Sequence, residues 1–327
     1  MIDRRTFLWA MAGGLLAAPL AAEAQQVGKM WRIGWLSPAS VSADAYELEA
    51  LLDGLRKLNY VEGRTIRIEA RWGEGNSQRL PELARALVES NVDLICTSGT
   101  LATAAAKHAT KTIPIVFGRA AFPDQTGLVA SLVRPGGNLT GVTFIGPEYG
   151  KRLELLREVS PKVRRVVLLY NDQNVASVLA MNETREWAKT LQAVVEPLGV
   201  HDRASLQTAL VAIRQGKHDA LMTTADPLLA SYRAVIVEFA SGLRLISMYG
   251  DREYVKSGGL MFYGTSTTDM WRHAAIYVDR ILKGANPGEL PVEQPKLFEL
   301  LINLKAAKAL GLTIPPSLLQ RADQVIE

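Results

Sequence analysis

Polar side chains follow most of the short apolar runs in this 327-residue chain. The clearest case is Ser98-Gly99-Thr100, which separates the apolar run 93–97 from an alanine-rich helical segment, 101–109. Hydroxyls and backbone N–H groups at the start of a helix can hold a carboxylate, because the helix dipole is positive there. The alternative is that Ser98 or Thr100 simply caps the helix.

The remaining candidate contacts follow the other predicted strands. In open α/β sheets, ligands bind beyond the carboxyl ends of the strands. In chain order these ends supply Ser37, Arg119, Asn171, Asp226, Tyr249 and Tyr263. Either tyrosine could stack on an aromatic solute with its phenol as a polar handle, or could only pack the two halves of the protein together.

Motifs for catalysis and for cofactors are absent from the sequence. There is no G-x-S-x-G elbow, no S-x-x-K and no glycine-rich phosphate loop. The four histidines are widely separated, and the single cysteine, Cys96, lies in an apolar run typical of a buried strand. The many carboxylates are expected mainly on solvated helix faces. We expect no metal, no cofactor and no enzyme activity, and keep an exported α/β enzyme as the weakest alternative.

The first 24 residues predict an export signal. Arg4 and Arg5 precede an apolar stretch, 7–20, that is too short to span a bilayer, and an A-x-A site ends at Ala24. The paired arginines are typical of the twin-arginine route, with the general secretory route as the alternative. We therefore expect cleavage near Ala24 and a periplasmic mature protein.

Composition restricts the possible partners. The formal net charge is +4, and the basic residues are spread along the chain instead of forming the stripe that nucleic-acid binding requires. A charged fraction of 21% and a hydrophobic fraction of 48% are ordinary for a soluble globular protein. We expect a monomer that binds a small molecule and no nucleic acid.

Apolar runs and amphipathic segments alternate along the chain, which predicts α/β architecture with parallel sheets. The predicted strands are 31–37, 65–71, 93–97, 113–117, 139–144, 165–171, 220–224, 243–249 and 260–263. The predicted helices are 44–58, 78–90, 101–109, 125–132, 148–159, 177–192, 205–215, 228–241 and 268–283.

The pattern begins again after a break near residue 145, so two similar lobes with a ligand cleft between them are expected. Residues 28–145 and about 266–293 are assigned to lobe 1, and residues 146–265 and about 294–327 to lobe 2. Two lobes joined by several chain segments should open and close about a hinge, burying the ligand between the strand ends.

Seven segments carry a resemblance to a known family: 93–100, 113–117, 126–141, 151–156, 226–228, 290–295 and 314–316. Together they resemble the substrate-binding proteins of ABC importers, of the tryptophan/tyrosine-binding type, over essentially the whole mature chain. The resemblance implies two Rossmann-like parallel-sheet lobes of the type I periplasmic-binding fold, with ABC permease subunits in the inner membrane as partners. A sensor that presents its solute to a signalling receptor is the alternative.

One position departs from the pattern of the resembled family. Relatives commonly have Gly-Asp-Pro where this chain has Ala121-Phe122-Pro123. An acid there would suit an ammonium group, whereas Phe122 leaves an apolar wall and Arg119 nearby adds a cation. The sequence therefore favours an aromatic or apolar carboxylate over an amino acid.

Overall fold

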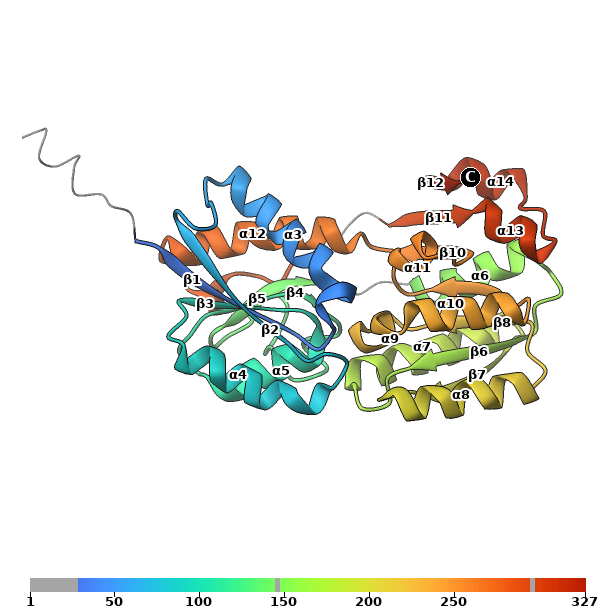
Figure 1. The fold of residues 1–327 in the computed structure, drawn as a ribbon, viewed down its shortest axis with the longest axis horizontal. Helices are drawn as coiled ribbons and strands as arrows, with labels where there is room; N and C mark the ends of the chain where they lie inside the picture. Colours follow the sequence, from blue (N-terminus) through green and yellow to red (C-terminus); the bar gives the residue numbers. More distant parts are fainter. Residues whose placement is uncertain (1–28, 145–147, 295–297) are drawn as a thin grey trace, which may run out of the picture.

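The computed structural model describes residues 29–144, 148–294 and 298–327. The predicted export signal lies outside these described residues and stays a prediction. Within them, no helix is both long and apolar enough to cross a membrane. Figure 1 shows two lobes lying side by side, each with its own sheet.

The first lobe contains a five-stranded parallel sheet in the order β2-β1-β3-β4-β5. Its strands are β1 (Trp31–Ser37), β2 (Ile66–Trp72), β3 (Leu94–Thr97), β4 (Ile115–Ala120) and β5 (Leu139–Thr143). Its helices are α3 (Val41–Lys57), α4 (Leu80–Glu89), α5 (Gly99–Ala109) and α12 (Thr267–Leu282), with 3₁₀ turns η1 (Ser77–Arg79) and η2 (Pro287–Glu289).

Both faces of this sheet are covered by helices (Figure 1). Successive side chains of a strand point to opposite faces. Thus Trp35 joins the core under α3 and α12, whereas its neighbour Leu36 joins the core under α4 and α5. A strand buried on both faces needs a continuous apolar run, which is why such runs predicted this sheet.

The second lobe contains a seven-stranded sheet in the order β12-β11-β10-β9-β8-β6-β7, parallel except where β11 runs antiparallel to β10. Its strands are β6 (Arg165–Tyr170), β7 (Val194–Gly199), β8 (Ala220–Thr223), β9 (Ile246–Tyr249), β10 (Met261–Gly264), β11 (Glu299–Asn303) and β12 (Gln324–Ile326). Its helices are α6 (Glu148–Val159), α7 (Val175–Thr190), α8 (Arg203–Gln215), α9 (Pro227–Ser231), α10 (Arg233–Gly242), α11 (Glu253–Lys256), α13 (Leu304–Leu310) and α14 (Pro316–Arg321).

The chain passes between the lobes after β5, after β10 and before β11. Helix α12 therefore returns to pack beside α3, whereas β11 and β12 extend the sheet of the second lobe. The lobe boundaries expected from the sequence lie near these three crossings, and they stay a proposal. The expected fold class, two α/β lobes on parallel sheets, is confirmed.

Two local predictions are wrong. Residues 125–132 form turns and bends instead of a helix, because Phe122 (φ 48°) and Gly127 (φ 71°) both adopt left-handed backbone conformations around Pro123. The predicted helix 228–241 is two helices, α9 and α10, which meet at Tyr232. Strands β7, β11 and β12 were not predicted.

Candidate functional site

Helix α3 carries two acids on the face that packs into the protein. Asp44 and Glu47 are buried, at helical spacing from the core residues Leu51 and Leu55. Acids on such a face are rarely fully buried unless they have partners. Ser37, at the carboxyl end of β1, provides one by donating from Oγ to Asp44 Oδ2 at 2.6 Å.

Glu47 gathers partners from three other elements of the first lobe. Ser98 donates from Oγ to Glu47 Oε2 at 2.7 Å, and Trp271 of α12 donates from Nε1 to the same oxygen at 2.8 Å. Arg119, near the end of β4, donates from Nη1 to Glu47 Oε1 and forms an ion pair with it. The strand-end side chains predicted to face a ligand are therefore organised around an acid that was not predicted.

Arg119 also reaches across to the second lobe. Its Nη2 lies 2.9 Å from Oδ2 of Asp251, just beyond the carboxyl end of β9, and the Tyr46 hydroxyl donates to the same oxygen at 3.0 Å. Burial works against the Arg119 charge, yet Glu47 and Asp251 together hold its pKa well above the ordinary value. This guanidinium is thus already paired with two carboxylates.

Asp44 lies at the edge of this charged cluster. Its burial, followed by the neighbouring Glu47 charge, raises its pKa well above the usual 3.8, although Arg119 acts in the opposite direction. A carboxyl in this setting favours its protonated form.

A second polar cluster lies at the strand ends of the other lobe. Asp226 accepts from Asn171 Nδ2 at 3.3 Å, from Asn174 Nδ2 at 2.8 Å and from the backbone N–H of Leu228 at 2.9 Å. Burial raises the pKa of Asp226, while the two amides lower it. Asp226 and Asn171 are therefore brought together as predicted from their positions after β8 and β6, and Asn174 is added.

The start of α5 faces this second cluster. Gly99 has φ +83°, and a Cβ added there would lie 2.9 Å from Cγ of Pro227 in the other lobe, so glycine is required on both counts. Residues from both sides, including Thr100, Asn171 and Asp226, line the same narrow gap between the lobes. The helix start and the Asp226 cluster are thus directly opposed across the lobe interface.

Capping does not account for the hydroxyls at this helix start. Ser98 is the N-cap residue, but its side chain makes no cap hydrogen bond and donates to Glu47 instead. Thr100 Oγ1 accepts from the backbone N–H of Ala121 at 3.2 Å. Both hydroxyls therefore connect α5 to neighbouring elements.

The predicted aromatic contacts pack mainly against other side chains. The Tyr249 ring is buried and stacks on Tyr254, with the ring centroids 4.6 Å apart. Tyr263 is half-buried and stacks on Phe298 at 5.9 Å. Phe122 is buried against Tyr149 at 6.4 Å. Packing, the alternative given for the two tyrosines, describes Tyr249 well.

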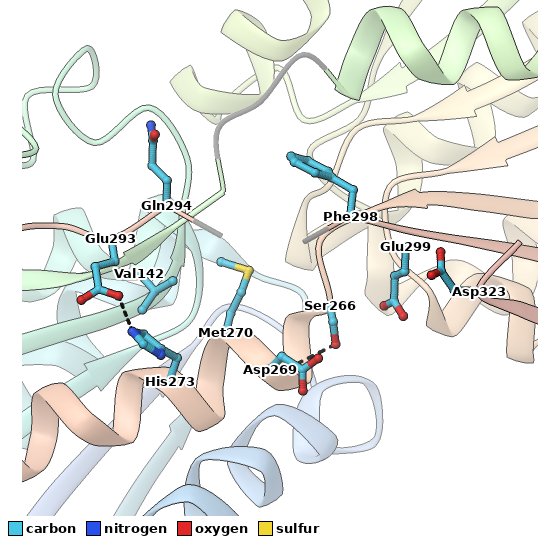
Figure 2. A pocket seen from close by; sticks show the side chains of 10 residues that line it. All are labelled: Val142, Ser266, Asp269, Met270, His273, Glu293, Gln294, Phe298, Glu299 and Asp323. Atoms are coloured by element: carbon cyan, nitrogen blue, oxygen red, sulfur yellow. Dashed lines mark hydrogen bonds and ion pairs between the residues drawn. The ribbon is translucent and has the colours of Figure 1, made fainter. Parts of the chain in front are cut away.

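A larger groove of about 590 Å³ lies beside the crossovers, and Figure 2 shows its lining side chains. His273 and Glu293 point toward one another there as a hydrogen-bonded pair. Asp269 pairs with Arg272 at 2.7 Å, and Glu299 with Arg252 at 3.0 Å. Several of the charges that line this groove are therefore neutralised within the protein.

Within residues 29–144, 148–294 and 298–327, no group of three or more His, Cys, Asp or Glu side chains is placed so that it could hold a metal ion. Cys96 is buried in β3, and burial raises the pKa of its thiol. An unreactive core thiol is the expected consequence.

A family model described as ABC transporter substrate binding protein matches residues 38–326. The chain belongs to this family. A tyrosine-binding protein of Clostridioides difficile (strain R20291) is 26% identical to this substrate-binding protein over 264 residues, covering 81% of this chain and 76% of the relative.

Solved structures share the fold across the lobes. A conserved domain protein of Vibrio cholerae has a TM-score of 0.86 at 29% identity, and an ABC domain of Streptococcus pneumoniae in complex with L-Trp has 0.85 at 26%. Each of these two comparisons covers 91% of this chain and 100% of the other protein's chain. A substrate-binding protein of Clostridium difficile, solved in a ligand-free, open form, is 24% identical and has a TM-score of 0.64. That comparison covers 91% of this chain and 99% of the other chain. The substrate-binding protein therefore has the type I periplasmic-binding fold, in a family described by substrate binding.

Sequence reasoning missed the acids and cations contributed by helices. Asp44 and Glu47 are on the buried face of α3, and Glu148 and Arg152 are on that of α6. The expectation that carboxylates lie on solvated faces is wrong for these acids. A signal was available, because both pairs occupy positions in register with core leucines.

Proposed function

We propose that this substrate-binding protein captures an aromatic amino acid between its two lobes and delivers it to the permease of an ABC importer. The observation that carries the proposal is the convergence of buried charged and amide side chains from both lobes at the strand ends. Arg119, Glu47 and Asp251 form one cluster, and Asn171 and Asp226 form the other. The relatives named for tyrosine and bound to L-Trp support the solute class.

Within the cleft, we assign the solute carboxylate to the start of α5. The N-terminal end of this helix carries a partial positive charge, and Gly99 lets the other lobe approach it closely. Asp226, opposite this helix start, is assigned to the solute amine. Ser37 and Ser98 act through Asp44 and Glu47, which they hold in place.

Position 122 does not argue against an amine. The Phe122 ring packs on Tyr149 within the protein, and Asp226, whose hydrogen-bond donors are neutral side-chain amides and backbone N–H groups, is buried at the strand ends of the second lobe. An ammonium group is therefore supplied with a carboxylate without an acid at position 122. We accordingly favour an amino acid over the amine-free carboxylate expected from the sequence.

Lobe closure is part of the proposal. The relative solved as ligand-free and open resembles this fold less closely, with a TM-score of 0.64, than the L-Trp complex does at 0.85, although the two identities are 24% and 26%. This difference supports a closed arrangement of the lobes here. Closure would bury the solute and present one combined surface to the permease.

Export is proposed from the leader. Secreted protein should begin near Gln25, after cleavage at Ala24. N-terminal sequencing of periplasmic protein tests this, and an intact Met1 in a cytoplasmic pool would contradict it. If the twin-arginine route is used, replacing Arg4 and Arg5 by lysine should block export.

The proposed function is tested by a thermal-shift screen of the mature protein with all common amino acids and with amine-free aromatic acids. A ligand that binds only the folded state raises the unfolding midpoint, and the rise grows with the logarithm of the ratio of ligand concentration to Kd. Calorimetric titration then ranks the solutes that shift it. We expect tyrosine or tryptophan to bind, and indolepropionate and phenylpropionate to bind far more weakly. Tight binding of the amine-free acids alone would contradict the solute class.

A further inference from the structure

Glu148 and Arg152 form a buried charged pair at the lobe interface, separate from the two clusters described above. Each has a hydrogen-bonding atom without a partner among the described residues. Glu148 begins α6, and Arg152 follows one turn later, with Nη2 of Arg152 3.4 Å from Oε1 of Glu148. Both side chains are 1% exposed. They share the apolar face of α6 with Leu155 and Val159, where a charged pair is costly to bury.

Each member of this pair has one atom without a partner among the described residues. These atoms are Oε2 of Glu148, an acceptor, and Nη1 of Arg152, a donor. Arg152 is otherwise fixed, because its Nε donates to the backbone carbonyl of Tyr263 at 2.6 Å. The unused donor is therefore held in place by the end of β10.

Glu148 and Arg152 line the same small cavity, which both lobes enclose. Phe144 and Met270 contribute from the first lobe, whereas Ala225 and Gly250 contribute from strand ends of the second. The cavity volume is about 10 Å³, the space of roughly one water molecule. Ala225 precedes Asp226, so this cavity adjoins the proposed solute position.

Charge restricts what fits. The Glu148–Arg152 pair has no net charge to neutralise, and Arg119, which also lines the cavity, is already paired with Glu47 and Asp251. One oxygen that donates one hydrogen bond and accepts another completes both side chains at once. A hydroxyl group has this capacity.

We propose that Glu148 and Arg152 bind a hydroxyl group at the end of the solute farthest from its carboxylate, so that the protein selects a phenol over an unsubstituted phenyl ring. The inference rests on the proposed function and specifies its solute. The hydroxyl donates to Oε2 of Glu148 and accepts from Nη1 of Arg152. Without it, these buried groups lose a partner, and sites built in this way discriminate strongly against the analogue lacking the hydroxyl.

Calorimetric titration of the wild-type mature protein with L-tyrosine and L-phenylalanine tests this directly. We expect tyrosine to bind at least about tenfold more tightly. The Glu148→Gln variant should reduce that ratio below about threefold while its affinity for phenylalanine changes little, because phenylalanine has no hydroxyl to contact position 148. Glu154→Gln is the matched control, because Glu154 lies on the same helix, is partly exposed and pairs with Lys151 at 2.8 Å.

Other outcomes overturn the inference in distinguishable ways. Equal wild-type affinity for the two amino acids would show that the cavity holds a water molecule only, and would leave the proposed function intact. If Glu148→Gln changed the ratio between tyrosine and tyrosinamide instead, the carboxylate would lie here. If no aromatic amino acid bound the wild type, the proposed function itself would fail. The wild-type ratio needs no variant, so the test stands even if Glu148→Gln misfolds.

Discussion

Arg119 and Asp251 form an ion pair of 2.9 Å between the two lobes, and both side chains are 2% exposed. Arg119 belongs to β4 of one sheet, whereas Asp251 follows β9 of the other. When the lobes part, both groups return to water, and the pair is lost. A buried pair of this kind favours the closed arrangement only while its other hydrogen bonds are also made, which Glu47 and Tyr46 ensure.

Asp251→Asn should weaken solute binding. The amide keeps the shape of the side chain but removes the charge that draws Arg119 to the second lobe. Loss of a hydrogen bond to a charged group costs about 1.5–3 kcal/mol, which corresponds to a Kd higher by roughly 10- to 150-fold. Calorimetry of the variant measures this. Glu186→Gln, which removes an exposed pair with Lys189, is the control and should leave Kd unchanged.

Asp226→Ala should destabilise the second lobe by about 2–4 kcal/mol. The change removes the N-cap of α9, worth about 1 kcal/mol, and leaves the buried amides of Asn171 and Asn174 without their acceptor. Urea unfolding followed by circular dichroism measures the loss. A change within about 0.5 kcal/mol would show that the amides find other partners.

Gly118→Ala should disturb the Glu47 cluster from a distance. A Cβ at this position lies 2.5 Å from the ring of Trp271, whose Nε1 donates to Glu47. Overpacking of this kind costs about 1–3 kcal/mol of the free energy of unfolding. Gly242→Ala is the matched control, because nothing lies within 4 Å of its added Cβ. The control should be neutral or slightly stabilising, and equal effects would contradict the account.

Asp44→Asn should change how stability depends on pH. Burial and the charge of Glu47 raise the pKa of Asp44 well above 3.8, so the folded protein keeps this proton at pH values where the unfolded chain has lost it. The folded state then binds more protons, and the free energy of unfolding falls as pH rises above about 4. The asparagine variant lacks this contribution. Urea unfolding between about pH 4 and pH 7 should therefore show the wild type losing stability relative to the variant, and a constant difference would contradict it.

Much of the fold follows from local pattern. Apolar runs predicted most of the strands that are buried on both faces, because such a strand has no solvated side to interrupt the run. Strand β11 is an exception, since it is buried but was not predicted. Strand β7 was not predicted because it lies at the edge of its sheet and its apolar run is interrupted by Glu196 and Pro197. Such residues are tolerated in an edge strand but not in a central one. Residues 125–132 show the opposite error, in which a helical spacing of apolar residues was overridden by left-handed turns.

The candidate site was predicted only in part. The strand-end rule indicated Ser98, Arg119, Asn171 and Asp226, and the structure brings them together in two pairs through Glu47 and through a direct contact. The contact between Arg119 and Asp251 depends on how two separate lobes meet. No local spacing encodes that meeting, so the pairing could not be predicted.

Solution scattering of the mature protein, with and without L-tyrosine, tests the central claim that the two lobes close on a bound solute. The solute concentration is set from the calorimetric Kd so that the site is saturated. We expect a smaller radius of gyration with solute than without, since the pairing of Arg119 with Asp251 requires the lobes to meet. An unchanged radius of gyration at saturation would contradict capture by lobe closure.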